Sequence, residues 1–366
     1  MKQIIFKAIM NGEGIVNFDD NSQKYTLNKL KIGDYSKTRN DNIKLCKKTF
    51  FKKKDSNGNF IKDEDGNDVY DYCVKISADC IRKAIFSNSV ESVNPIILKK
   101  DLMACTYMLS PVGQCRGYLY TVKDDFAYKR KSPLTITDAN EISGAKSELE
   151  INSTSGDRNA TSMFYTEKVG KTEYEFFGVI DPKTLMFNVA DPIFDRMGIH
   201  PDWVTNGLAE QVLHNLYGDM AKPTIGYFTS SQKCLTSSIS EFGIMLNKEL
   251  VNYLIKYILI NVMKCSIKRN TAFANVTSLS IKVVDNIFED NFESPNGWID
   301  INSEDDIKKL DFDIYNPYVL STEEEVKEME SYKEEYNKKL SEMKDEKNRL
   351  KEEKAKNKKS KKNEES

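Results

Sequence analysis

The chain has 366 residues, of which 39% are hydrophobic and 30% are charged, and its formal net charge is −2. A chain of this size can bury a full core as one large domain or two. The near-neutral charge excludes a protein that is basic throughout, so a nucleic-acid site would have to be a local stripe. Seven scattered cysteines without a C-x-x-C pair favour reduced thiols in the cytoplasm over a zinc site.

The first predicted element is a buried strand over residues 4–10, which ends in a turn at residues 11–14. Residues 19–70, approximately, are polar and carry turn signals at Asn57-Gly58 and Asp65-Gly66. We interpret this segment as an excursion from the core.

A short strand over residues 72–76 leads into a helix that Ser77 can cap. Arg82 and Lys83 lie in the first turns of this helix, beside apolar positions that share one face. Residues 100–175, approximately, form a second excursion, rich in β-prone and turn residues and poor in helical periodicity.

Within the second excursion, three adjacent cations run into Ser132 and a β-branched segment: Lys129, Arg130 and Lys131. A hairpin with apolar and aromatic tips is predicted after Arg158, with Met163 and Phe164 near its tip. Basic loops interleaved with aromatic residues are typical of proteins that bind single-stranded nucleic acid.

Two strands are predicted over residues 172–188, joined by a turn at residues 181–183. Helical spacing follows over residues 201–217, a core helix over about 247–264 and a strand over 272–284. These elements predict an α+β domain over residues 1–316.

The composition changes beyond residue 316. A capping-box signature at residues 321–324 begins a charged helix, predicted over residues 321–350 to be solvated and to lie outside the fold. Residues 351–366 lose even the sparse apolar positions, so we expect them to be disordered.

Several kinds of function have no support in the sequence. Neither a phosphate-cradling loop nor a dinucleotide fingerprint occurs, which argues against nucleotide hydrolysis. The two histidines lack the context of a catalytic triad. The longest apolar run, over residues 250–265, is interrupted by polar residues, so no membrane span is expected. We predict neither a cofactor nor a metal site.

The residues that we expect to contact RNA belong to the capped helix, the basic run and the hairpin. They are Ser77, Arg82, Lys83, Lys129, Arg130, Lys131, Ser132, Arg158, Met163 and Phe164. Their cations would hold the RNA backbone without reading its sequence.

The order of these segments resembles the RAMP superfamily of CRISPR effector proteins, in particular the backbone subunit that polymerises along guide RNA in Cascade-type complexes. The resemblance covers residues 1 to about 285. It is carried by the strand at 4–10 with its glycine turn, the strand-to-helix element at 74–84, the segment at 130–139 and the aromatic strand at 174–180. Ser132, Leu134, Asp138 and Ala139 match the family pattern S-x-L-x-x-x-D-A.

The resemblance implies a modified ferredoxin-like or RRM-like core, with finger-like insertions and a β-hairpin thumb. Its implied partners are guide RNA, target nucleic acid, other CRISPR effector subunits and further copies of the chain in a head-to-tail filament, with no membrane.

Two other functions stay open. Some backbone subunits of the family cut target RNA with a metal-dependent carboxylate, for which Asp19, Asp20 or Asp138 would be the candidates. The chain could also be an unrelated α+β structural or interaction protein that assembles through its C-terminal helix. Co-purification of RNA of a fixed short length would favour the first two functions, and metal-dependent cleavage would separate them.

Overall fold

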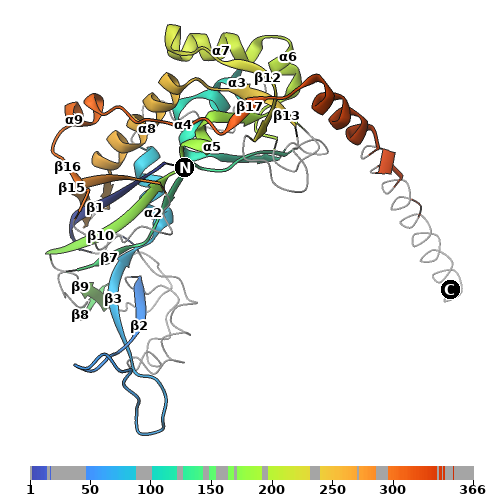
Figure 1. Cartoon of the computed structure of the whole chain (residues 1–366). Helices are drawn as coiled ribbons and strands as arrows, with labels where there is room; N and C mark the ends of the chain where they lie inside the picture. The colour runs from blue at the N-terminus through green and yellow to red at the C-terminus, as the bar shows by residue number, and fades with distance from the viewer. Residues whose placement is uncertain are drawn as a thin grey trace, which may run out of the picture. The chain divides into compact units, whose positions relative to one another are not determined.

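The computed structural model has both helices and antiparallel sheets, which confirms the predicted α+β class (Figure 1). It describes residues 2–14, 17, 47–87, 101–121, 127–142, 148–153, 164–168, 171–191, 197–230, 240–269, 272–285, 296–335, 338–339, 341–342 and 349. Contacts divide the chain into two compact units. Unit 1 comprises Met1–Gly117, Lys131–Leu185 and Lys248–Tyr315; unit 2 comprises Tyr118–Arg130, Met186–Asn247 and Asn316–Ser366.

The main sheet of unit 1 is built around β1 (Gln3–Glu13), which pairs antiparallel with β10 (Lys171–Ile180) on one side and β15 (Phe273–Val284) on the other. The strand order is β14–β15–β1–β10–β7–β3–β2, while β16 pairs with β15 and β6 with β10. The remaining strands are β2 (Lys48–Lys52), β3 (Tyr70–Ile76), β6 (Leu134–Ile136), β7 (Ala139–Glu141), β14 (Ser266–Lys268) and β16 (Ile299–Ile301).

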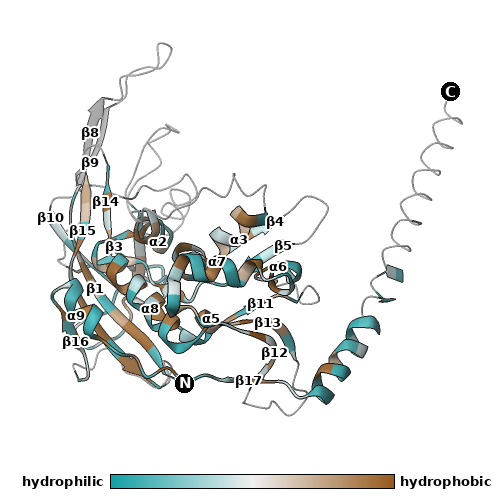
Figure 2. Cartoon of the chain, turned by 90° about the horizontal axis from the view of Figure 1, so that it is seen from above, coloured by the Kyte–Doolittle hydropathy of each residue, from teal (hydrophilic) through white to brown (hydrophobic). Residues whose placement is uncertain are grey.

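The centre of this sheet is apolar, as Figure 2 shows for β1. Phe6 lies opposite Gly178 in the β1–β10 register, and its ring packs edge-on against Phe176 at 6.1 Å between centroids. A Cβ atom on Gly178 would come within 2.1 Å of Cζ of Phe6. Glycine is therefore needed at position 178 so that β10 can approach β1 beneath the ring.

The helices of unit 1 are α2 (Ala78–Ser87), α3 (Asp101–Leu109), α4 (Pro111–Arg116), α8 (Lys248–Met263) and α9 (Glu304–Lys309). The core helix predicted near residues 247–264 is confirmed as α8. The second excursion, expected over about residues 100–175 to be rich in β-prone and turn residues, begins with the two helices α3 and α4. Five of the nine residues of α3 are buried and its apolar residues surround the axis, so no amphipathic period appears in the sequence.

A hairpin is present in the second excursion, where β8 (Glu148–Ser153) pairs antiparallel with β9 (Phe164–Lys168). The connecting residues 154–163 lie outside the described residues. The strands expected near residues 172–188 are β10 and β11 (Phe187–Val189), but the predicted turn between them is the short helix α5 (Pro182–Met186). Asp181 caps this helix, since its carboxylate accepts from the Lys183 backbone at 3.2 Å and from the Thr184 hydroxyl at 2.9 Å.

Unit 2 contains a four-stranded antiparallel sheet in the order β11–β13–β12–β17. Its other strands are β12 (Thr224–Ser230), β13 (Glu241–Met245) and β17 (Tyr318–Leu320), and β4 (Tyr118–Thr121) pairs separately with β5 (Ala127–Arg130). The single helix predicted over residues 201–217 is two helices, α6 (Pro201–Thr205) and α7 (Leu208–Tyr217), followed by η3 (Gly218–Met220). Gly207 separates them with a φ of 80°, a left-handed conformation that interrupts helical bonding.

The predicted C-terminal helix begins as expected and is described continuously over residues 323–335. Thr322 and Glu325 form a reciprocal capping box: the Thr322 N–H donates to the Glu325 carboxylate at 2.8 Å, and the Glu325 N–H donates to the Thr322 hydroxyl at 3.3 Å. Figure 2 colours this helix mainly as hydrophilic.

The expectation that this helix lies outside the fold is wrong for its first turns. Met329 is only 6% exposed, and Nζ of Lys333 lies 2.5 Å from Oδ2 of the fully buried Asp191 carboxylate in unit 2. Lys333 also lies 4.9 Å from the centroid of the Tyr227 ring. Among the described residues of this mostly polar helix, Met329 is buried and Lys333 is paired with Asp191 in another segment of unit 2.

The described helices include none with the length and apolar character that crossing a bilayer requires.

Candidate nucleic-acid interface

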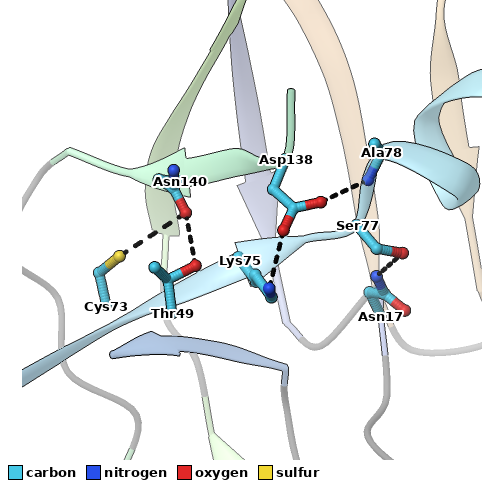
Figure 3. A network of polar contacts seen from close by, with 8 residues as sticks. All are labelled: Asn17, Thr49, Cys73, Lys75, Ser77, Ala78, Asp138 and Asn140. Atoms are coloured by element: carbon cyan, nitrogen blue, oxygen red, sulfur yellow. Dashed lines mark hydrogen bonds and ion pairs between the residues drawn. The ribbon is translucent and has the colours of Figure 1, made fainter. Parts of the chain in front are cut away.

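A network of polar contacts surrounds the junction between β3 and α2 in unit 1 (Figure 3). Asp138, between β6 and β7, accepts a hydrogen bond from Nζ of Lys75 at 2.7 Å and from the backbone N–H of Ala78 at 2.8 Å. The carboxylate thus caps the first turn of α2, where the helix dipole favours negative charge. It holds the segment before β7 against the start of the helix.

These contacts change the acidity of Asp138. Partial burial raises the pKa of its carboxyl group, but the hydrogen bonds from Lys75 and Ala78, together with the charge of Lys75, outweigh burial. The pKa of Asp138 therefore lies below its ordinary value, and the group is ionised at neutral pH.

Ser77 occupies the position that the sequence predicts, directly before α2, and its carbonyl accepts from the Ile81 N–H at 3.1 Å. Its hydroxyl accepts a hydrogen bond from the side-chain amide of Asn17 at 2.8 Å, while the helix cap comes from Asp138 (Figure 3). Ser77 thereby connects Asn17, which follows β1 in the chain, to the start of α2.

Four cations gather around the first turns of α2. We call Lys47, Lys75, Lys83 and Arg269 the cation cluster. Burial raises the pKa of the Cys80 thiol on α2, and the nearby charges of Arg269, Lys47 and Lys83 partly oppose that effect. The charge of Lys47 also helps to lower the pKa of Asp138. The backbone carbonyl of Lys47 accepts a hydrogen bond from the Lys75 N–H at 2.8 Å. Residues from three distant parts of unit 1 therefore concentrate positive charge at one helix end.

A hollow of about 800 Å³ lies beside the β14–β15 connection, next to Arg269. Its walls include Lys268, Arg269 and Phe273, whose side chain is 48% exposed, and Glu13 at the end of β1. An exposed aromatic ring beside two cations can stack on a base while the cations meet phosphate.

The structure places the predicted helix cations as expected, with Lys83 exposed and Arg82 half-buried on α2. The basic run behaves differently. Lys129 and Lys131 are exposed, but Arg130 is only 7% exposed, and its guanidinium donates to the Phe187 carbonyl at 3.1 Å and to Oδ1 of Asn188 at 2.6 Å.

Arg130 is therefore a buried structural residue of unit 2, and its assignment to a surface stripe is corrected. The cause is the alternation of β5, which points Tyr128 and Arg130 inward and Lys129 outward. The boundary between the two units also falls between Arg130 and Lys131. Adjacency of the three cations in the sequence thus does not make one continuous surface.

Ser132 is used locally. Its hydroxyl accepts from the Leu134 N–H at 3.1 Å and lies within donating distance of the Cys115 and Leu134 carbonyls, at 3.0 and 3.1 Å. The family pattern at residues 132–139 thus contains a turn residue, Ser132, and a helix cap, Asp138.

Four predicted residues lie outside the described residues: Arg158, Met163, Asp19 and Asp20. Phe164 begins β9, and its side chain lies outside them as well. Within the described ranges, no three His, Cys, Asp or Glu side chains are grouped as a metal site would require.

The structure adds Lys47 and Arg269, which the sequence interpretation did not single out. Each belongs to a pair of adjacent cations, Lys47-Lys48 and Lys268-Arg269. Those pairs were a usable signal, but their relation to α2 depends on sheet pairings between residues far apart in the chain.

A family model described as Type I-Fv CRISPR-associated protein Cas7fv-like matches residues 1–295. No curated protein matches the chain.

Proposed function

Since the chain belongs to the Cas7fv-like family of Type I-Fv CRISPR-associated proteins, we propose that it binds guide RNA without sequence preference and polymerises along it. Family membership confirms the resemblance to RAMP backbone subunits of Cascade-type complexes. The proposal adds what this subunit does: it holds the guide so that target nucleic acid can pair with it.

The cation cluster at α2 is the observation that carries the proposal. Lys47, Lys83 and Arg269 approach the same first turns of the helix, and Phe273 offers an exposed ring nearby. Cations that follow a phosphate backbone bind strongly without distinguishing bases.

The topology of unit 1 supports the same proposal. In chain order, β1, α2, β7, β10, α8 and β15 form a strand–helix–strand–strand–helix–strand series, and β15, β1, β10 and β7 are neighbours in that order. This order, with β3, β6 and other elements as additions, supports the ferredoxin-like or RRM-like description, which rests on a split βαβ arrangement.

We assign Asp138 a positioning role in place of a catalytic one. Its carboxylate accepts hydrogen bonds from Lys75 and from the α2 backbone, and these contacts give it a structural role. If target RNA were cut in the presence of Mg²⁺ by the wild-type protein and not by Asp138→Asn, the endonuclease function would replace this assignment.

The RNA-binding proposal is tested by charge reversal. Arg269→Glu combined with Lys47→Glu should weaken binding to unrelated single-stranded RNAs equally and reduce the slope of log affinity against log salt by about 0.7 for each lost phosphate contact. Lys222 is an exposed residue before β12 in unit 2, and Lys222→Glu, which reverses one charge elsewhere, is the control for each of the two reversals. Wild-type affinity and salt slope in the double variant would reject the cation cluster as the RNA site.

The proposal places the protein in the cytoplasm, with guide RNA, target nucleic acid, other effector subunits and neighbouring copies in a head-to-tail filament as partners. The free state of Cys73, Cys80, Cys105, Cys115 and Cys265 suits such a reducing compartment.

A further inference from the structure

The C-terminal helix of unit 2 fills a pocket whose walls suit an ammonium group. Nζ of Lys333 lies 2.5 Å from Oδ2 of the fully buried Asp191 carboxylate and 4.9 Å from the centroid of the Tyr227 ring. The Tyr227 ring packs against Phe242, with 5.2 Å between the centroids. A carboxylate and an aromatic face are the two groups that stabilise a cation away from water. We call Asp191 and Tyr227 the lysine pocket.

The segment that supplies this lysine is attached to unit 2 at other points as well. β17 adds to the edge of β12, and the Ser321 N–H directly after β17 donates to the Tyr227 carbonyl at 2.9 Å. Met329 is buried and Val326 is half-buried. Residues three and four positions apart share one face of a helix, so Val326, Met329 and Lys333 form a single docked stripe.

The pattern of the docked stripe occurs a second time in the chain. Residues 326–333 read V-K-E-M-E-S-Y-K, and residues 340–347 read L-S-E-M-K-D-E-K. Each segment begins with an apolar residue, continues with Glu-Met after one further residue and ends with Lys. We call residues 326–333 the first repeat and residues 340–347 the second repeat. The second repeat lies mostly outside the described residues, within the helix that the sequence predicts over residues 321–350.

The charges of the second repeat favour a protein partner over a nucleic acid. The second repeat contains three carboxylates and two lysines, so its net charge is negative. A phosphate backbone would be repelled by this segment. A recessed carboxylate, in contrast, can take the one lysine of the stripe, Lys347, while the acidic side chains stay in water. The partner therefore needs the chemistry of the lysine pocket.

A second copy of the chain has that pocket. The second repeat cannot occupy the pocket of its own chain together with the first repeat, because two heptads of helix carry Lys347 about 21 Å beyond Lys333. In the pocket of another copy, the second repeat offers the same apolar, methionine and lysine side chains as the first. Exchange of the repeats keeps one buried ion pair in each pocket, so the local concentration of copies decides which repeat binds.

We propose that the second repeat binds the lysine pocket of a second copy, where it replaces that copy's first repeat and pairs Lys347 with the partner's Asp191. In a free monomer the first repeat has the advantage, because its own chain holds it beside the pocket. The link between copies rests on the proposed function, since a shared guide is what brings copies close together. The C-terminal helix then strengthens the filament from outside the part of the chain that matches the family.

Binding of the second repeat is measured without RNA, on the full-length protein. Lys333→Gln weakens the first repeat but keeps a donor for the Asp191 carboxylate, so this variant should fold. A fluorescein-labelled peptide of residues 336–351 should bind Lys333→Gln, and it should bind the wild type about tenfold more weakly, because the tethered Lys333 competes. The wild-type measurement keeps the test valid even if the variant proves unstable.

Two altered peptides show whether the lysine of the stripe carries the binding. The Lys347→Gln peptide should bind Lys333→Gln protein about thirtyfold more weakly than the unaltered peptide, the loss expected when one partner of a buried charge pair is removed. The Lys344→Gln peptide is the matched control, because it loses a lysine that lies off the stripe, and it should bind as the unaltered peptide does. Asp191→Asn combined with Lys333→Gln should abolish binding, since the pocket then has no charge.

Sedimentation of the guide-free, full-length protein tests the link between copies. Lys333→Gln should self-associate as its concentration rises, and the further change Lys347→Gln should prevent this, whereas Lys344→Gln should not. The proposal is overturned if the peptide binds neither the wild type nor Lys333→Gln, if the two altered peptides bind alike, or if self-association does not depend on Lys347. Because RNA is absent throughout, failure of the guide-binding proposal would leave these results unchanged.

Discussion

Single residues show how charge that appears available in the sequence is used inside the fold. Asp138 matches the carboxylate of the family pattern, yet its oxygens hold Lys75 and the first N–H of α2. Arg130 belongs to a run of three cations, yet it is buried against Asn188 and the backbone of Phe187. Both residues act first on stability, and any effect on RNA binding would follow from that.

Asp138→Asn should lower the free energy of unfolding by about 1–2 kcal/mol, because a charge-assisted hydrogen bond is lost at a site that is one-third exposed. The pKa of Asp138 in the folded protein lies below the ordinary value of 3.8, so its carboxylate contributes stability above pH 3.8. That contribution disappears as the pH falls through the lower folded-state pKa.

Denaturant titrations of the wild type and of Asp138→Asn between acidic and neutral pH measure this contribution. The difference between their free energies of unfolding should shrink toward low pH. Asp305→Asn is the control, because Asp305 pairs with Lys308 on an exposed helix face and should contribute little to the free energy of unfolding. A difference for Asp138→Asn that is constant at all pH values would contradict the ionised cap.

Arg130→Met should cost about 3 kcal/mol of unfolding free energy, since it leaves buried acceptors without their charged donor. Lys129→Met on the same strand points outward and should change the unfolding free energy by less than about 0.5 kcal/mol. Urea midpoints of the two variants decide the matter. Equal midpoints would mean that Arg130 does not hold unit 2 together.

At the scale of elements, burial explains both the successes and the failures of sequence prediction. The helix α8 and the strands β1 and β15 have apolar patterns that show their type directly. The helix α3 has apolar residues all round its axis and no visible period, and a single glycine at position 207 divides one predicted helix into two. The C-terminal helix was identified by its capping box, but its attachment depends on Asp191, which lies far away in the sequence.

Lys333→Ala should lower the unfolding free energy by about 3 kcal/mol, because it leaves the Asp191 carboxylate buried without its ion pair. Lys339→Ala removes only an exposed pair with Glu335 and should leave the free energy of unfolding nearly unchanged. Thermal unfolding of both variants provides the comparison. A Lys333→Ala protein as stable as Lys339→Ala would mean that the helix lies free of unit 2.

For the whole molecule, the sequence supported the family and the α+β class, because short motifs and strand patterns are local. It could not show the cation cluster, in which Lys47, Lys83 and Arg269 come together only through pairings among β2, β3, β14 and β15. Nor could it show that the basic run is divided between two units, since unit 2 combines segments near residues 118–130, 186–247 and 316–366. Contacts between distant segments carry this information.

Assembly is the prediction that belongs to this scale. A head-to-tail contact between copies does not close on itself, so longer guide RNA should recruit proportionally more subunits. Mass measurement of complexes on RNAs of two lengths tests whether the number of bound subunits rises with RNA length. Replacement of Met163, Phe164 and Tyr165 by serine should abolish this series of increasing stoichiometries while the protein still folds. One fixed oligomer on both RNAs would reject the filament.

The pairing of Lys333 with Asp191 also constrains how the family can have diversified. Asp191 lies within the part of the chain that matches the family, whereas Lys333 lies beyond the end of the match at residue 295. A relative that loses the C-terminal helix would lose this ion pair to a buried carboxylate unless position 191 became neutral as well. We therefore expect the two positions to covary among homologues: an acidic residue at 191 should accompany a C-terminal helix with a cation at 333, and shorter relatives should have an uncharged side chain at 191.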